Sequence, residues 1–137
     1  MPDLTVEQFE QRIKGAFLWL TINREGLAEV AQDLKDAAAH IEQVGWTQNR
    51  NFEVPTHQKT SPCCAVGALW ALERPDSDGF YVGTAVWTFE AVAQQGLVTF
   101  NDLPTTEASQ VTDIMRTVAQ NIDDYLEQTR DQSRPIR

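Results

Sequence analysis

The chain has 137 residues, of which 42% are hydrophobic and 23% are charged, and its 20 acidic and 11 basic residues give a net charge of −9. A chain of this length forms about one domain and can bury a sizeable core without disulfides. The negative charge disfavours direct binding to nucleic acid or anionic lipid and favours a basic protein partner. The competing interpretation is that the acidic residues simply keep the protein soluble.

Two amphipathic helices are predicted at the start of the chain. The first runs from about residue 6 to residue 21, because Thr5 is a good N-cap, Gln8 can reach back to it, and apolar residues recur every three or four positions. The second follows a break near Asn23 and ends at Gly45. A glycine directly after the last apolar residue suits the left-handed position that ends many helices.

A loop and a buried helix are expected next. Residues 46–60 have no helical period and are rich in Asn, Gln, Thr and Pro, which indicates an ordered loop. A third helix is predicted with Ser61 as N-cap and Pro62 at the first helical position, where the missing N–H removes no helical hydrogen bond. This helix is apolar nearly all round as far as Leu72, which predicts central burial.

The next segment is expected to contain a turn, a helix and an extended piece. The composition of residues 75–79 is typical of a turn. A fourth helix is predicted at about 84–95, with Gly96 as its end, and residues 97–100 fit one short extended segment.

A long last helix completes the predicted fold. Thr105 or Thr106 is expected to cap it, and its apolar stripe continues to Leu126, which also makes this helix a candidate surface for a homo-oligomer. About five helices predict an all-α domain, orthogonal or bundle-like, because each apolar stripe must be covered by another helix. We expect this single domain to span residues 1–128 and to be followed by a flexible tail at 129–137.

Two adjacent thiols raise the question of a reactive site. Cys63 and Cys64 fall in the first turn of the predicted third helix, where the helix dipole favours a thiolate. A nucleophilic Cys64 would need a base, and His57 in the preceding loop can fold back toward it, with Asp102 to orient the imidazole. Core packing is the competing interpretation, because free cysteine is among the most buried residues. Adjacent cysteines near His57 or His40 match no usual zinc spacing, so we expect neither a metal site nor a cofactor.

Three short motifs give the chain a resemblance to a known family. With GWTQ at 45–48, CCAVGAL at 63–69 and FND at 100–102, it resembles a family of short uncharacterised proteins from actinobacteria and their phages. The resemblance covers roughly residues 27–120 and implies an arrangement rather than an activity. The residues that it implies belong together are Trp46, Gln48, Cys64, Gly67, Asn101 and Asp102.

Four of these polar and aromatic residues are candidate binding residues: Trp46, Gln48, Asn101 and Asp102. A tryptophan after a helix end can stack on a ligand ring, but packing back over the helix is the competing interpretation. Asn101 and Asp102 precede a proline and a helix start, so a local capping turn is the alternative for them.

The functional prediction follows from charge and from the motifs that the sequence lacks. It contains no phosphate-binding glycine loop, HExxH helix, GxSxG elbow or EF-hand pattern. We therefore expect a small non-enzymatic binding or regulatory protein, such as a phage accessory protein, that acts on another protein through an acidic helical surface. The alternative is a small enzyme or ligand-binding domain built around Cys64, His57 and Asp102. No signal peptide or membrane span is recognisable, which predicts a cytoplasmic protein.

Overall fold

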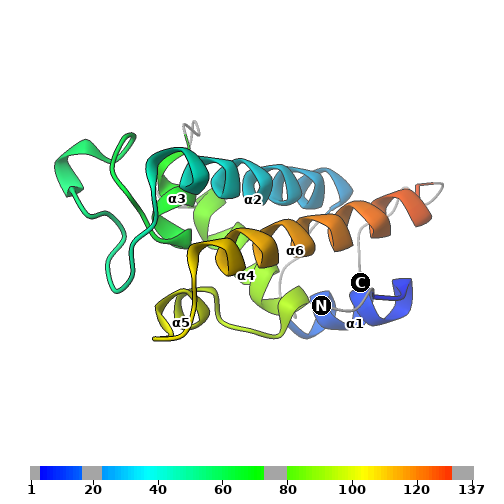
Figure 1. Cartoon of the computed structure of the whole chain (residues 1–137). Coiled ribbons are helices and arrows are strands. Elements are labelled where there is room, and N and C mark those ends of the chain that lie inside the picture. Colours follow the sequence, from blue (N-terminus) through cyan, green and yellow to red (C-terminus); the bar gives the residue numbers. More distant parts are fainter. Residues whose placement is uncertain (1–3, 17–22, 73–79, 131–137) are drawn as a thin grey trace.

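The fold is built from helices. Figure 1 shows the computed structural model of the chain, which describes residues 4–16, 23–72 and 80–130. The helices are α1 (Val6–Ala16), α2 (Arg24–Val44), α3 (Ala65–Ala71), α4 (Phe80–Ala93), α5 (Leu97–Asp102) and α6 (Ala108–Gln128), with one 3₁₀ turn at Pro55–His57. These described segments contain no strand, only isolated β-bridges. The predicted all-α single domain is confirmed.

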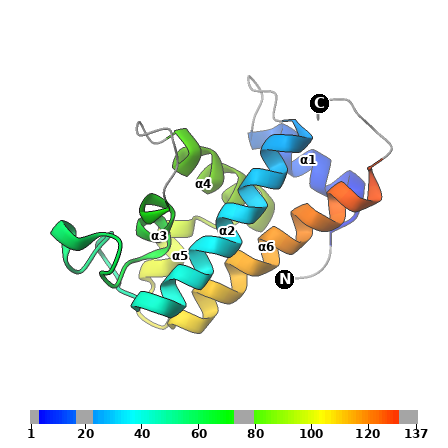
Figure 2. The same cartoon turned by 90° about the horizontal axis from the view of Figure 1, so that it is seen from above.

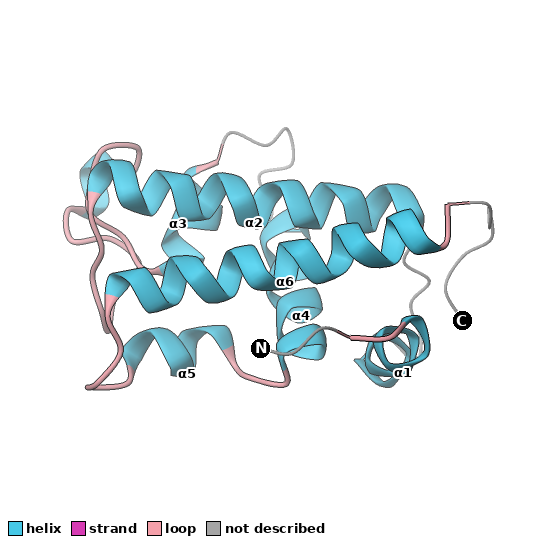
Figure 3. Ribbon diagram, turned by 45° about the vertical axis from the view of Figure 1, so that its right-hand side comes forward, coloured by secondary structure: helices cyan, strands magenta, loops and turns pink. Residues whose placement is uncertain are grey.

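The long helices α2 and α6 lie side by side and run in opposite directions (Figures 1 and 2). Helix α4 crosses beneath this pair, α1 packs at one end of the molecule, and α3 and α5 pack at the other (Figure 3). Between the layers lies one core, whose largest fully buried side chains include Phe9, Ile13, Leu27, Leu34, Phe89, Leu97, Met115 and Ile122. The apolar stripe of α6 is therefore covered mainly by other helices of the same chain. No described helix combines the length and the apolar composition that crossing a membrane requires.

Helix α1 begins as the sequence predicts. Gln8 N donates to Thr5 Oγ1 at 3.1 Å, and Thr5 N donates to Gln8 Oε1 at 3.0 Å, which completes the predicted capping box. Phe9 is buried and stacks on Tyr125, with ring centroids 4.4 Å apart. The described part of the helix ends at Ala16, so the predicted extension to residue 21 lies outside the described residues.

The ends of α2 also match the prediction. Asn23 is the N-cap, and its Oδ1 accepts from Gly26 N at 2.7 Å. Gly45 follows the last helical residue with a φ of 106°, and its N–H donates to Ile41 O at 2.8 Å. That φ lies in the region that only glycine adopts without strain.

The prediction for residues 97–100 was wrong, because they belong to helix α5 rather than to an extended segment. Glu90 Oε2 accepts from Leu97 N at 3.1 Å, and Leu97 is fully buried, so a tertiary contact starts the helix. Gly96 is the N-cap of α5 with an ordinary φ of −66° and does not end α4 in the left-handed region. Gln94 takes that conformation instead, with a φ of 56°. The predicted turn at 75–79 lies outside the described residues.

The N-cap of α6 is Glu107, not Thr105 or Thr106. Its side chain and that of Gln110 form a reciprocal capping box, in which Glu107 N donates to Gln110 Oε1 at 2.7 Å. At the other end, Thr129 is buried and its Oγ1 donates to Tyr125 O at 2.7 Å. Thr129 is thus packed against the domain, although we placed it in the flexible tail; residues 131–137 lie outside the described residues.

Candidate functional site

The three sequence motifs meet where the loop that follows α2 returns to the body of the protein. The left-handed backbone of Gly45 turns the chain so that Cys63 N donates to Gly45 O at 3.2 Å and Thr47 N donates to Cys63 O at 3.1 Å. A Cβ on Gly45 would also lie 3.3 Å from the Pro62 ring. The end of α2 and the start of the segment leading into α3 are thereby fixed side by side.

A second contact closes the loop from its other side. Cys63 also pairs with Phe52 in an antiparallel bridge, and Glu53 N donates to Pro62 O at 2.9 Å. Ser61 Oγ accepts from Val54 N at 2.8 Å. Residues 53–60 beyond this closure are all exposed, so the loop is a short projection on a hydrogen-bonded base, as Figure 1 shows.

Helix α3 starts three residues later than predicted, because the backbones of Pro62 and Cys63 form these bridges. Cys64 is its N-cap, with an extended backbone, and the Cys64 Sγ accepts from Gly67 N at 3.3 Å. The same thiol donates to Asn51 Oδ1 at 3.5 Å. A Cβ on Gly67 would lie 2.1 Å from Asn51 O, so the glycine of the motif is required by a close backbone approach.

Both thiols are core groups. Cys63 is fully buried, and burial, followed by the neighbouring Cys64, raises its pKa to about 12. Burial also raises the pKa of Cys64, and this effect exceeds the lowering by the N–H groups of Gly67 and Val66. The negative charge of Asp102 acts in the same direction as burial. The helix start was expected to favour a thiolate, but the structure favours the neutral thiol at neutral pH.

Asn101 is the centre of the site and is almost fully buried. Its Oδ1 accepts from the indole Nε1 of Trp46 at 2.8 Å and from Ala65 N at 3.0 Å, at the start of α3. Its Nδ2 donates to Thr47 O at 3.2 Å and to Asp102 Oδ1 at 2.9 Å. A carboxamide has two donor hydrogens and two acceptor lone pairs, so all four are used. We call Asn101 with these four partners the Asn101 hub.

Gln48 and Asp102 tie the same loop to α5. Gln48 Nε2 donates to Asn101 O at 3.0 Å and to Leu103 O at 2.8 Å, where α5 ends. Asp102 Oδ1 accepts from Asn49 N at 2.8 Å, and Asn49 has a left-handed φ of 64°, which asparagine tolerates better than most residues. The four candidate binding residues are therefore in mutual contact through hydrogen bonds within the protein.

The two histidines are not part of this network. His57 lies in the exposed 3₁₀ turn, and the side-chain contact that the structure gives it joins its Nδ1 to Thr56 Oγ1 at 3.0 Å. None of the contacts between described residues brings His57 to Cys64 or Asp102. His40 lies on α2, where burial lowers its pKa and its Nε2 has no hydrogen-bond partner. Among the described residues, no group of three His, Cys, Asp or Glu side chains could hold a metal ion.

The structure defines the class of the protein, and the comparison with known protein families then defines its family. It is an all-α protein in which three motifs, far apart in sequence, close one loop onto two short helices. The chain belongs to a family of unknown function, DUF6197, which matches residues 26–121. The matched region contains the whole Asn101 hub and leaves α1 outside. Neither the curated proteins nor the solved structures contain a match.

The sequence did not point to the loop asparagines. Asn51 contributes its carbonyl to Cys64 N at 3.0 Å and its side chain to the Cys64 thiol, and Asn49 supplies the left-handed turn. The signal for both is the pair of asparagines in the run Q-N-R-N at 48–51, because asparagine is favoured where a chain must turn sharply.

Proposed function

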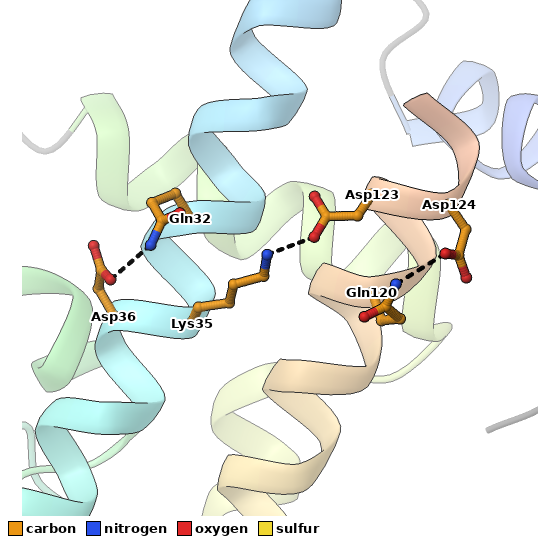
Figure 4. A network of polar contacts seen from close by, with 6 residues as sticks. All are labelled: Gln32, Lys35, Asp36, Gln120, Asp123 and Asp124. Atoms are coloured by element: carbon orange, nitrogen blue, oxygen red, sulfur yellow. Dashed lines mark hydrogen bonds and ion pairs between the residues drawn. The ribbon is translucent and has the colours of Figure 1, made fainter. Parts of the chain in front are cut away.

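We infer that the outer face of the α2–α6 pair is the functional surface of the protein, because it carries two ion pairs flanked by exposed carboxylates. Where the helices meet, Lys35 contacts Asp123 at 2.5 Å (Figure 4), and Arg116 contacts Glu42 at 2.7 Å. We call these two ion pairs the seam. Each pair joins one basic and one acidic side chain, so the seam is neutral. All four side chains are partly exposed, so the seam lies at the surface.

On either side of the seam the charged side chains of α2 and α6 are mainly acidic, and Arg130, just beyond α6, pairs with Glu127 at 3.0 Å. Positions 25, 29, 32, 36, 39 and 43 form one exposed stripe of α2, because they are spaced by three or four residues. Positions 113, 117, 120, 124 and 127 form the corresponding stripe of α6. These acidic stripes contain Glu25, Glu29, Asp36, Asp113, Asp124 and Glu127 and no lysine or arginine.

We propose that the protein is a non-enzymatic binding or regulatory protein, of the phage accessory type, and that it binds a basic partner protein through the acidic stripes. The observation that carries this proposal is the separation of charge, since Lys35 and Arg116 lie at the seam and the flanking stripes carry more carboxylates than the one that Arg130 pairs with. Such a surface attracts a positively charged partner over about one Debye length, roughly 8 Å at physiological salt. The rigid helices present these charges at little entropic cost.

The alternative is an enzyme or ligand-binding domain around Cys64, His57 and Asp102, and it has weaker support. It requires a depressed pKa at Cys64, whereas burial raises that pKa. It also requires His57 near the thiol, whereas the contact given for its ring is local. The four candidate binding residues use the hydrogen-bonding groups described above within the protein, which favours a structural role for them.

Photo-crosslinking tests the proposal. A photoreactive residue at Ala39, on the α2 stripe, is expected to capture a basic protein in cells that express the chain naturally, and one at Gln58, in the loop, is not. The affinity for that partner, once purified, is expected to fall at least tenfold between 50 and 500 mM salt, as charge-driven binding requires. Equal capture at both positions, or an affinity indifferent to salt, would contradict the proposal.

A charge-matched pair of variants separates the stripes from net charge. Asp36→Asn with Asp124→Asn removes two stripe charges, and each asparagine can still accept the local hydrogen bond from Gln32 or Gln120. Glu7→Gln with Glu53→Gln removes two exposed charges elsewhere. Weaker binding is expected only for the first pair. If both pairs weaken binding equally, overall charge and not the α2–α6 face recognises the partner.

A further inference from the structure

An open hollow lies between α1 and the C-terminal end of α4, away from the acidic stripes and the Asn101 hub. Its volume is about 560 Å³, and it is lined by Gln8, Gln11, Arg12, Gly15, Ala91 and Gln94. This volume is within the range of small-molecule sites, roughly 300 to 1,000 Å³. Because α1 lies outside the family match, the hollow joins residues outside that match to residues within it.

One face of α1 forms a fixed wall of this hollow. The lining residues of α1 are spaced by three or four positions and share a face. The opposite face is anchored by Phe9 and Ile13, both almost fully buried. Tyr125 also donates its hydroxyl to Glu10 Oε2 at 2.7 Å, so the helix is held to α6 by polar as well as apolar contacts.

Gly15 has no packing reason to be a glycine in the described structure. A Cβ built on it would meet no atom within 4 Å, and no left-handed φ requires it. Glycine inside a helix is less favourable than alanine by about 1 kcal/mol. Gly15 keeps this part of the hollow open, because any larger residue would extend a side chain into it.

The chemistry of the lining favours an anion with polar substituents. Among the described residues that line the hollow, Arg12 is the one that carries a charge, and none is a carboxylate. Its Nη1 donates to Val92 O at 2.5 Å, and among the described residues it forms no ion pair. A guanidinium carries five N–H donors in a fork that matches a carboxylate, so donors remain beyond this one contact. The carboxamide of Gln11 can donate to and accept from hydroxyl groups. Gln8 uses Oε1 in the capping box and keeps its Nε2 donors, whereas Gln94 donates from Nε2 to Ala91 O at 2.9 Å and keeps Oε1 as an acceptor.

We propose that this hollow binds a small hydroxylated carboxylate, whose carboxylate group pairs with Arg12 and whose hydroxyl groups contact the glutamine side chains. This site is independent of the proposed protein-binding face. A purely structural role for Arg12 would need only its hydrogen bond to Val92 O in the last turn of α4. The proposed site also uses the other N–H donors of the guanidinium.

NMR titration of the full chain tests this proposal, with sodium lactate, gluconate and galacturonate as probes and sodium chloride at equal ionic strength as the reference. We expect at least one carboxylate to shift the side-chain signals of Arg12, Gln11 and Gln94 saturably, and lactamide and sodium chloride to leave them unchanged. An identical response to chloride, or no saturable shift with any of the three carboxylates, would overturn the proposal.

Two glycine variants make the test independent of folding. Gly15→Leu fills the hollow with a better helix former, so the melting temperature is expected to be maintained or raised while the affinity falls at least tenfold. Gly83→Leu is the matched control, because Gly83 also lies in a helix, α4, where an added Cβ would meet no atom within 4 Å, and it does not line the hollow. Arg12→Gln is expected to lose binding as well. Full affinity in Gly15→Leu, or equal loss in Gly83→Leu, would exclude the hollow as the site.

Discussion

The protein contains two polar networks that differ in their access to water. In the Asn101 hub, Asn101 is 1% exposed and every hydrogen-bonding group of its side chain has a protein partner. In the seam, the side chains of Lys35 and Asp123 are 42% and 36% exposed. A buried group that loses its partner has no water to replace it, whereas an exposed ion pair can exchange its partner for solvent at little cost. The hub can therefore specify the fold, whereas the seam remains in contact with solvent.

The largest expected effect comes from Asn101→Ala. This change removes the partners of Trp46 Nε1, Ala65 N and Thr47 O, and each buried group left unsatisfied costs about 1 to 3 kcal/mol. We expect the free energy of unfolding, measured by urea denaturation, to fall by about 3 to 5 kcal/mol.

A matched surface change on the same helix controls for the effect of truncation itself. Val98 is 50% exposed on α5, and Val98→Ala is expected to change the free energy of unfolding by less than about 0.5 kcal/mol. If Asn101→Ala costs no more than this control, water or another side chain replaces Asn101, and the hub does not specify the fold.

The parts of the fold that the sequence predicted are those with a local physical cause. The Thr5 capping box, the break near Asn23 and the Gly45 helix end were correct, because each depends on residues within four positions. Helix α5 was missed because Leu97 is held by Glu90, on another helix, and by burial in the core. The start of α3 was misplaced because Cys63 forms bridges with two distant segments.

The sequence predicted part of the membership of the candidate site and not its chemistry. The motifs indicated that Trp46, Cys64 and Asn101 belong together. In the structure Asn101 accepts from Trp46 and from the backbone N–H of the residue directly after Cys64. Spacing alone could not show that the thiol is buried, which reverses the expected direction of its pKa. It also could not place His57 relative to the thiol, because the path of an irregular loop depends on tertiary hydrogen bonds.

A second, smaller effect concerns alkaline pH. Burial raises the pKa of Cys63 from 9.0 to about 12, and burial with the Glu10 hydrogen bond raises that of Tyr125 from 10.0 to about 12. Between pH 9 and 12 the unfolded chain therefore binds fewer protons than the folded one, so stability is complete below pH 9 and falls as the pH rises toward 12. Urea denaturation under reducing conditions at pH 7, 9, 10 and 11 is expected to show this decline.

The variant Cys63→Ala identifies the contribution of the thiol to this pH dependence. It is expected to lower stability at pH 7, because it leaves a small cavity, and to make the decline above pH 9 less steep. The native protein is also expected to react with iodoacetamide at pH 7 far more slowly than the denatured chain. An unchanged slope in the variant would mean that Cys63 already ionises in the folded state near pH 9.

The smallest effect is expected at the seam. Lys35→Met removes the charge that contacts Asp123 and retains much of the apolar stem, so the free energy of unfolding is expected to change by less than about 1 kcal/mol. The variant also leaves the carboxylate of Asp123 unbalanced beside the acidic stripes, which should strengthen binding to a basic partner at low salt. A loss above about 2 kcal/mol in urea denaturation would mean that the seam, like the hub, supports the fold. The charges of the seam would then be explained by their contribution to stability, and only the charges of the acidic stripes would support a binding surface.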